Sequence, residues 1–239
     1  MFYLIGLGLN VDSLTNEAVK ALKKCEKIYL ESYTINFPYD IKKLEEIAGK
    51  IVELGREKVE SEEIVLEGKD KDIALLVYGS PLIATTHISL ILRAEKEKIK
   101  VKVIHNASIF DAISETGLQS YKFGKIASMP NWKDKQKTLS FVKILKGNMG
   151  IEAHTLILID MELGLKEALE QLEEALKESG LENMKESKIL VCSQLGYKGR
   201  VVYGKIEEIK NTNLKMPFCF IMPAKMHFLE EEALRRFEI

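Results

Sequence analysis

Apolar runs alternate with amphipathic helical patterns along the whole chain. The first half contains predicted strands at residues 2–6, 27–31, 73–77 and 101–104. Predicted helices follow Thr15 as N-cap, with Ala18, Ala21, Leu22 and Cys25 facing inward, and cover 41–48 and the stretch from Pro81 to about Lys98. The run at 73–77 lacks polar alternation, which is typical of a strand buried on both faces of a parallel sheet. The pattern predicts an α/β protein.

The second half repeats this alternation without repeating the sequence. Strands are predicted at 154–160, 188–193, 201–203 and 218–222, and helices at 165–176, ending by Gly180, and at 228–237. No linker rich in Pro, Gly or Ser separates the halves. We therefore place the boundary in the loop after Ile104 and expect two α/β domains, 1–107 and 108–239, with a cleft between them of the kind that binds small molecules.

Composition narrows the function classes. The chain has 239 residues, 46% of them hydrophobic, with 35 Lys or Arg against 36 Asp or Glu. This content of apolar residues excludes disordered and fibrous proteins. The balanced charge argues against a general nucleic-acid binder and against a protein of anionic membrane surfaces.

The cysteines and the apolar opening segment have simple interpretations. Cys25, Cys192 and Cys219 are odd in number and lack C-x-x-C spacing, so we expect buried free thiols in a reducing cytosol, with no disulfide and no metal. Residues 1–9 fit a buried first strand better than a signal peptide, and no run approaches the ~20 apolar residues of a membrane helix. We expect a soluble, cytoplasmic protein.

Two glycine-containing turns are candidate ligand sites. Gly6-x-Gly8 resembles the start of a dinucleotide fingerprint, but Val11 stands at the third glycine position, so a plain tight turn is the alternative. The segment 78–87 follows a buried strand and places Thr85, Thr86 and His87 at a helix start. Helix capping needs one hydroxyl only. The turn at 104–109 carries a second histidine, His105, in an analogous position, which favours a shared site.

Ordered motifs along the whole chain carry a family resemblance. They include Tyr3-Leu-Ile-Gly-Leu-Gly-Leu9, Pro81-Leu-Ile-Ala-Thr-Thr-His87, Ile104-His-Asn-Ala-Ser-Ile109, His154-Thr-Leu-Ile-Leu-Ile-Asp160 and Pro223-Ala-Lys-Met-His-Phe-Leu-Glu-Glu-Glu-Ala-Leu234. In these motifs the chain resembles the diphthine synthase family, S-adenosylmethionine-dependent methyltransferases of the tetrapyrrole methylase superfamily. The Ala-Thr-Thr-His element and the Lys-x-His-Phe-x-Glu ending distinguish this family from the corrin and sirohaem methylases.

The resemblance implies a fold, a cofactor and a set of cofactor contacts. It implies two α/β domains of the tetrapyrrole methylase type, a homodimer, and S-adenosylmethionine bound in the interdomain cleft, with S-adenosylhomocysteine as product. Carried over by position, the donor contacts are Leu9, Ser80, Ile83, Ser108, Ile109, Ile159, Leu195 and Phe218. Backbone groups and apolar packing around adenine would make most of these contacts.

Three positions depart from the family pattern. Ser80 stands where the family usually has the aspartate of Gly-Asp-Pro, Tyr78 stands where a proline is usual, and Phe218 stands where a histidine can occur. A serine offsets the positive charges of the donor less strongly than an aspartate. We therefore expect weaker donor binding, or compensation by another residue.

The implied substrate is a histidine of elongation factor 2 that carries a 3-amino-3-carboxypropyl group, whose amine takes the methyl. Since only a neutral amine attacks, the candidate proton acceptors are His87, His105 and His227. Lys122, Lys225 and Arg200 could pair with the substrate carboxylate, although solvated surface is the alternative for each. No nucleophile or metal is required.

Three alternatives stay open at this point. A tetrapyrrole or corrinoid methyltransferase of the same superfamily is the first. A non-catalytic protein that binds elongation factor 2 is the second, because Ser80 permits loss of the donor site. A nicotinamide oxidoreductase is the third and rests on the two glycines alone.

Overall fold

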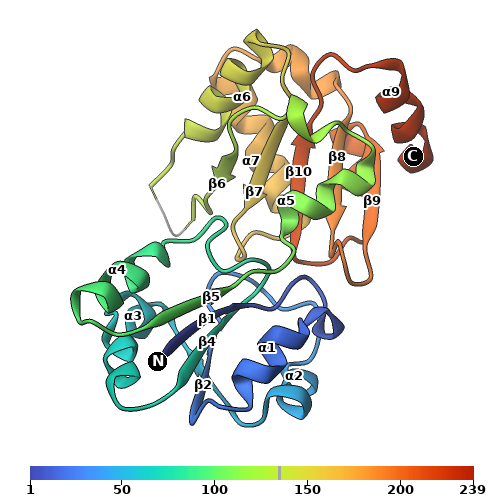
Figure 1. The fold of residues 1–239 in the computed structure, drawn as a ribbon. Helices are drawn as coiled ribbons and strands as arrows, with labels where there is room; N and C mark the ends of the chain where they lie inside the picture. The colour runs from blue at the N-terminus through green and yellow to red at the C-terminus, as the bar shows by residue number, and fades with distance from the viewer. Residues whose placement is uncertain (134–135) are drawn as a thin grey trace. The chain divides into compact units, whose positions relative to one another are not determined.

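The computed structural model describes residues 1–133 and 136–239, which form two compact units, Met1–Ala112 and Ile113–Ile239 (Figure 1). Each unit contains its own five-stranded sheet. The boundary predicted between residues 107 and 108 falls inside the first unit, just before the short helix α5 (Ile109–Ala112).

The first unit has an entirely parallel sheet with the strand order β3-β2-β4-β1-β5. Its strands are β1 (Phe2–Gly6), β2 (Lys27–Glu31), β3 (Ile51–Leu54), β4 (Ile73–Val77) and β5 (Val101–Ile104). Every residue of β1 and β4 is buried. This confirms the buried parallel strand predicted at 73–77, whereas the edge strand β3 had no sequence prediction.

Two helices of this unit begin where the sequence predicted, whereas the helix expected from Pro81 begins only at Ile88 and the helix at 56–60 was not predicted. The α-helices are α1 (Asn16–Leu22), α2 (Ile41–Ala48), α3 (Arg56–Glu60) and α4 (Ile88–Lys96), with 3₁₀ helices at Val11–Ser13 and Glu63–Lys69. Thr15 is the N-cap of α1, since its Oγ1 accepts a hydrogen bond from the backbone N of Ala18 at 3.1 Å. Cys25 lies beyond the end of α1 and is half-buried, so its predicted place on the inward helix face is wrong.

The second unit has a mixed sheet with the strand order β6-β7-β10-β8-β9. Its strands are β6 (Ala127–Met129), β7 (Thr155–Ile159), β8 (Ile189–Ser193), β9 (Arg200–Gly204) and β10 (Phe218–Met222). The pair β6 and β7 is parallel, and β10 runs antiparallel to both β7 and β8. Cys192 and Cys219 are buried free thiols that pair in register on β8 and β10.

Four α-helices and four 3₁₀ helices of the described residues accompany this sheet. They are α6 (Ser140–Gly150), α7 (Leu165–Glu178), α8 (Ile206–Ile209) and α9 (Phe228–Leu234), with 3₁₀ helices at Ile113–Thr116, Ser120–Lys122, Glu182–Glu186 and Arg235–Phe237. The apolar face predicted for α7 is buried, and the helix ends two residues before Gly180, which has a φ of +69°. The helix predicted at 228–237 is α9 followed by a 3₁₀ turn.

Within residues 1–133 and 136–239 no helix is long and apolar enough to cross a membrane. Within the same ranges no three side chains of His, Cys, Asp or Glu cluster in a way that could hold a metal ion.

Candidate functional site

In the first unit, the turns after three neighbouring parallel strands meet at one sheet edge. β1 is followed by Leu7-Gly-Leu9, β4 by Tyr78-Gly-Ser80, and β5 by His105-Asn-Ala-Ser108. Gly8 and Gly79 join the first two turns by a pair of backbone hydrogen bonds of 3.0 and 2.9 Å. The carboxyl edge of an open parallel sheet is where α/β proteins bind ligands, so this edge is a candidate site.

The close approach of these turns explains the two glycines of Gly6-x-Gly8. A Cβ on Gly6 would lie 2.6 Å from the carbonyl oxygen of Gly79 and 2.9 Å from the Cδ of Pro81. Gly8 has a φ of +71°, and a Cβ there would lie 2.7 Å from the Cβ of Ser13. The glycines are therefore required for packing between the turns, and they need no dinucleotide phosphate to explain them.

Asn106 holds the same turns together through its side-chain amide. Its Nδ2 donates to the carbonyl oxygens of Gly6 at 3.1 Å and Ser13 at 2.9 Å, and its Oδ1 accepts from the backbone N of Ala107 at 2.8 Å. The two bonds of Nδ2 join segments about a hundred residues apart in the sequence. Asn106 lies within the motif 104–109, but its role was not predicted from the sequence.

The predicted donor contacts of this unit lie along the three turns. Leu9, Ser80 and Ser108 are buried, whereas Ile83 and Ile109 are half-buried. The Ser108 hydroxyl donates to Oδ2 of Asp111 at 2.9 Å, and the Ser108 backbone N donates to the same oxygen at 2.7 Å. These two hydrogen bonds, backbone first, hold the pKa of the Asp111 carboxyl below its usual value.

Tyr78 packs against two other aromatic rings and forms a hydrogen bond with the first turn. Its hydroxyl donates to the carbonyl oxygen of Leu9 at 3.1 Å. Its ring meets Phe37 edge-on at 5.5 Å and lies 6.3 Å from the ring of Tyr39. Burial raises the pKa of Tyr78, so its hydroxyl stays protonated and remains a donor to Leu9.

In the second unit, the other three predicted donor contacts lie at one edge of the sheet. Ile159 ends β7, Phe218 begins β10, and Leu195 follows β8 by two residues. Because β10 is antiparallel to both neighbours, its first residue lies beside their last residues, and Phe218 pairs with Ser193. Leu195 and Phe218 are buried and Ile159 is half-buried, so this edge offers apolar surface.

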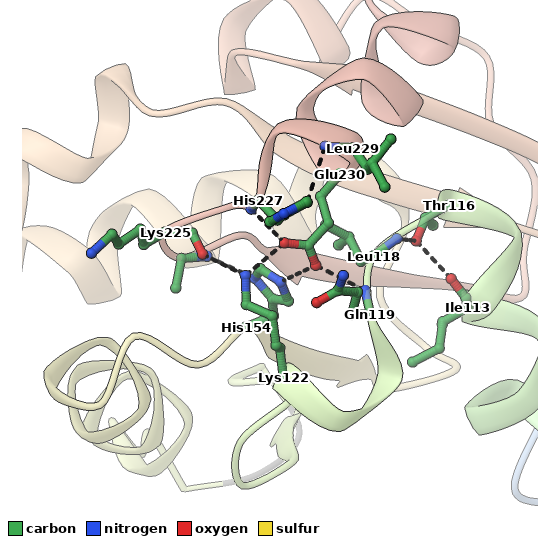
Figure 2. A network of polar contacts seen from close by, with 11 residues as sticks. Ile113, Thr116, Leu118, Gln119, Lys122, His154, Lys225, His227, Leu229 and Glu230 are labelled. Carbon is green, nitrogen blue, oxygen red and sulfur yellow. Dashed lines mark hydrogen bonds and ion pairs between the residues drawn. The ribbon is translucent and has the colours of Figure 1, made fainter.

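A buried carboxylate, Glu230 on α9, is the centre of the polar network in this unit (Figure 2). Its Oε1 accepts from the backbone N of Gln119 at 2.9 Å and from Nε2 of His154 at 3.0 Å. Its Oε2 accepts from the backbone N of His227 at 2.7 Å and from Nζ of Lys122 at 2.6 Å. Burial alone would raise the pKa of Glu230, but these four donors lower it to about 2.

His154 completes this network with both ring nitrogens. The backbone N of Ala224 donates to its Nδ1 at 3.0 Å, so the ring proton lies on Nε2 and points to Glu230. Burial lowers the pKa of His154, which keeps the ring neutral. Neither His154 nor Glu230 was selected from the sequence. The spacing His227-x-x-Glu230, a capping-box pattern, is the signal that could have indicated Glu230.

The sequence-predicted histidines have different surroundings. His87 is buried beside Pro81 in the turn before α4, whereas His105 is exposed after β5. His227 is exposed at the N-cap of α9, where its Nδ1 accepts from the backbone N of Leu229 at 3.4 Å. The structure therefore buries one of the two histidines that the sequence placed in a shared site and exposes the other.

The predicted cationic partners for a substrate also differ. Lys122 donates to Glu230 and, at 2.8 Å, to the carbonyl oxygen of Lys225, so it is neither solvated surface nor a free cation. The exposed ammonium of Lys225 lies 3.3 Å from a carboxylate oxygen of Glu152. Arg200 is exposed at the start of β9.

Comparison with known proteins agrees with the fold and with the sequence motifs. Residues 1–210 match the sequence profile of the Tetrapyrrole (Corrin/Porphyrin) Methylases. The diphthine synthase of Methanocaldococcus jannaschii is 38% identical, with 98% of each chain covered. The diphthine methyl ester synthase of Schizosaccharomyces pombe is 45% identical over 68% of this chain and 59% of its own. A crystal structure of diphthine synthase superimposes with a TM-score of 0.89 at 31% identity, covering 100% of this chain and 96% of the other.

The chain belongs to the tetrapyrrole methylase family, and it is a methyltransferase. Within that family its place is among the diphthine synthases. The predicted family and the predicted α/β class with two sheets are confirmed. A corrinoid or other tetrapyrrole substrate, a purely non-catalytic role and a nicotinamide oxidoreductase are not favoured.

Proposed function

We propose that this chain transfers methyl groups from S-adenosylmethionine to the amino group of the 3-amino-3-carboxypropyl-histidine of elongation factor 2, as a diphthine synthase. The observation that carries the proposal is the near full-length similarity to diphthine synthases. We further propose that it acts in the cytoplasm as a homodimer, with elongation factor 2 as its protein partner.

We assign donor contacts to the sheet edges of both units. In the first unit they are Leu9, Ser80, Ile83, Ser108 and Ile109, and in the second unit Ile159, Leu195 and Phe218. The chemistry of these residues fits the donor, since six of them are apolar and suit an adenine ring. Ser80 and Ser108 offer hydroxyls, and the turn backbones offer amides and carbonyls for the polar groups.

The reaction makes few demands on side-chain chemistry. When bound, S-adenosylmethionine supplies an activated methyl group whose leaving thioether is neutral, so no general acid is needed. The protein must align the amine with that methyl group, which contributes up to ~7–11 kcal/mol in favourable cases. It must also exclude water and remove a proton from the amine.

Mass spectrometry of elongation factor 2 tests the proposal. The factor carrying the 3-amino-3-carboxypropyl group, incubated with the enzyme and S-adenosylmethionine, should gain mass in whole methyl steps on one histidine. Unmodified elongation factor 2 serves as the control and should gain none. Mild alkali removes a methyl ester but not N-methyl groups, so treatment with alkali shows which acceptor is used.

Two other outcomes would favour one of the alternative functions. Calorimetric binding of S-adenosylhomocysteine without any mass gain, together with methylation of a corrinoid, would favour the tetrapyrrole methylase. Binding of elongation factor 2 without donor binding would favour the non-catalytic protein. Either result would overturn the proposed function.

The replacement of Ser80 by aspartate is expected to tighten donor binding. The buried Ser80 hydroxyl lies in the turn after β4, and a carboxylate there would form charge-assisted bonds to the positively charged donor. We expect the Kd for S-adenosylmethionine to fall about fivefold, since such bonds exceed neutral ones by roughly 1 kcal/mol. Calorimetric titration measures this. Ser61→Asp, exposed at the end of α3, adds the same charge as a control. Unchanged or weaker binding in Ser80→Asp would exclude a charge contact at this position.

A further inference from the structure

The hydrogen bonds of the ring nitrogens determine where each histidine carries its proton. His154 uses both nitrogens within the Glu230 network and has no lone pair to offer. In His227 the backbone N of Leu229 donates to Nδ1, so the neutral ring carries its proton on Nε2. His105 is exposed, and solvent can orient its ring freely.

His87 has the opposite arrangement. Its Nδ1 lies 3.0 Å from the carbonyl oxygen of Pro81, which can only accept, so Nδ1 carries the proton. The neutral ring therefore has a lone pair on Nε2. This atom is buried and has no hydrogen-bond partner within residues 1–133 and 136–239. A buried polar atom without a partner is rare in folded proteins, and a catalytic role is one of the reasons for it.

The local structure fixes the His87 ring in this orientation. The same Pro81 oxygen also accepts from Oγ1 of Thr85 at 3.0 Å, and Oγ1 of Thr85 accepts from the backbone N of His87 at 3.4 Å. This accounts for Thr85 and His87 in a turn whose helix has no side-chain cap. The two side chains and the carbonyl form one rigid unit, within the segment that also contains Ser80 and Ile83.

We propose that Nε2 of His87 is the atom that accepts the proton released by the substrate amine. This inference rests on the proposed function. The substrate ammonium transfers a proton to Nε2, the freed nitrogen lone pair forms a bond to the methyl carbon, and the pair of the broken carbon–sulfur bond stays on sulfur. The imidazolium keeps its Nδ1–H on Pro81, now as a charge-assisted hydrogen bond, and later releases the Nε2 proton to solvent.

The choice of His87 over the other histidines follows from the same atoms. A proton acceptor needs a lone pair in a fixed direction and a site shielded from water, which would otherwise compete for the proton. His154 and His227 lack the free lone pair, and the exposed His105 lacks the shielding. His87 alone among the four has both properties.

Two substitutions test the roles of the two ring nitrogens of His87 one at a time. In His87→Asn the side-chain amide nitrogen stands near the position of Nδ1, so it keeps the bond to Pro81 and removes the base. In His87→Gln the amide stands near Nε2, where it can accept a hydrogen bond but cannot take a proton. Glu95→Gln, on an exposed position of α4, is the control for substitution near this turn.

The measurements are single-turnover methyl transfer at saturating S-adenosylmethionine, calorimetric Kd for S-adenosylhomocysteine, and thermal unfolding. We expect both His87 variants to fold and to bind S-adenosylhomocysteine like the wild type. Methyl transfer should slow by about 10²- to 10⁴-fold, the usual contribution of a general base. Glu95→Gln should transfer at the wild-type rate.

Two results would overturn the inference. If His87→Asn or His87→Gln folds and transfers methyl groups at the wild-type rate, His87 is not the acceptor. If both lose S-adenosylhomocysteine binding together with activity, His87 only holds the turn in shape. Failure of the proposed function itself looks different, because the wild-type enzyme would then add no methyl group to modified elongation factor 2.

Discussion

Replacement of Glu230 by glutamine is expected to lower the free energy of unfolding of the second unit by about 3 kcal/mol, as for other broken buried ion pairs. Glu230 has 0% exposure and accepts from four donors. A glutamine amide replaces one accepting oxygen with a donor. In either orientation of the amide, two of the four donors would face its nitrogen and lose Glu230 as their acceptor.

Urea unfolding followed by circular dichroism measures this loss. Glu231→Gln is the matched control, because Glu231 is the next residue of α9 and is exposed. It removes the same charge and should change stability by less than ~0.5 kcal/mol. Equal stability of the two variants would mean that the four hydrogen bonds contribute nothing net to folding.

The same carboxylate predicts a loss of stability in acid. The pKa of Glu230 is about 2 in the folded protein and 4.5 as the ordinary value, so folding favours the ionised form. Its contribution is complete above about pH 5 and disappears as pH falls through the folded pKa near 2. Glu230→Gln should lack this component, so the difference in unfolding free energy between wild type and variant should shrink as pH falls over this range.

Substitution of Gly6 by alanine is expected to separate the turns after β1 and β4. The new Cβ would meet a backbone oxygen of Gly79 at 2.6 Å. Neither strand can move away, because β1 and β4 are interior strands of the first unit's sheet. Overpacking of this kind costs typically about 1–3 kcal/mol. Because Leu9 and Ser80 lie on these turns, we also expect the Kd for S-adenosylhomocysteine to rise at least about tenfold, equivalent to 1.4 kcal/mol.

Calorimetry and urea unfolding check both parts of this prediction. Gly55→Ala is the control in the same unit, since a Cβ there meets nothing within 4 Å. As a change from glycine to alanine at a helix N-cap, it should cost no more than about 1 kcal/mol. Wild-type donor affinity in Gly6→Ala would show that the donor does not use these turns.

The elements that could be predicted from the sequence are those whose apolar residues are buried in a regular pattern. β4 was predicted because all five of its residues are apolar and buried, and α7 because its apolar positions recur at helical spacing. β3 and β6 were missed because they are short edge strands, and two of the four side chains of β3 are exposed. α6 was missed because Gly147 and Gly150 weaken its helical pattern.

In the candidate site, too, some features could be predicted from the sequence and others could not. The turns after β1, β4 and β5 were predicted because glycines and polar residues follow buried strands there. The roles of Asn106 and Glu230 were not, because their partners lie up to 111 residues away along the chain. One sequence contains no information on which distant groups pair. Likewise, the free nitrogen of His87 depends on a carbonyl orientation that the residue type does not encode.

The position of Glu230 in the sequence has a consequence for folding during synthesis. Its donors on Gln119, Lys122, His154 and His227 are all made before it. Translation proceeds from the N-terminus, and domains generally fold as units in that order. The strands of the first unit are complete by Ile104, so this unit can fold while the rest is being made. The second unit reaches its final structure only after α9 emerges from the ribosome, and until then four donors in it lack their acceptor.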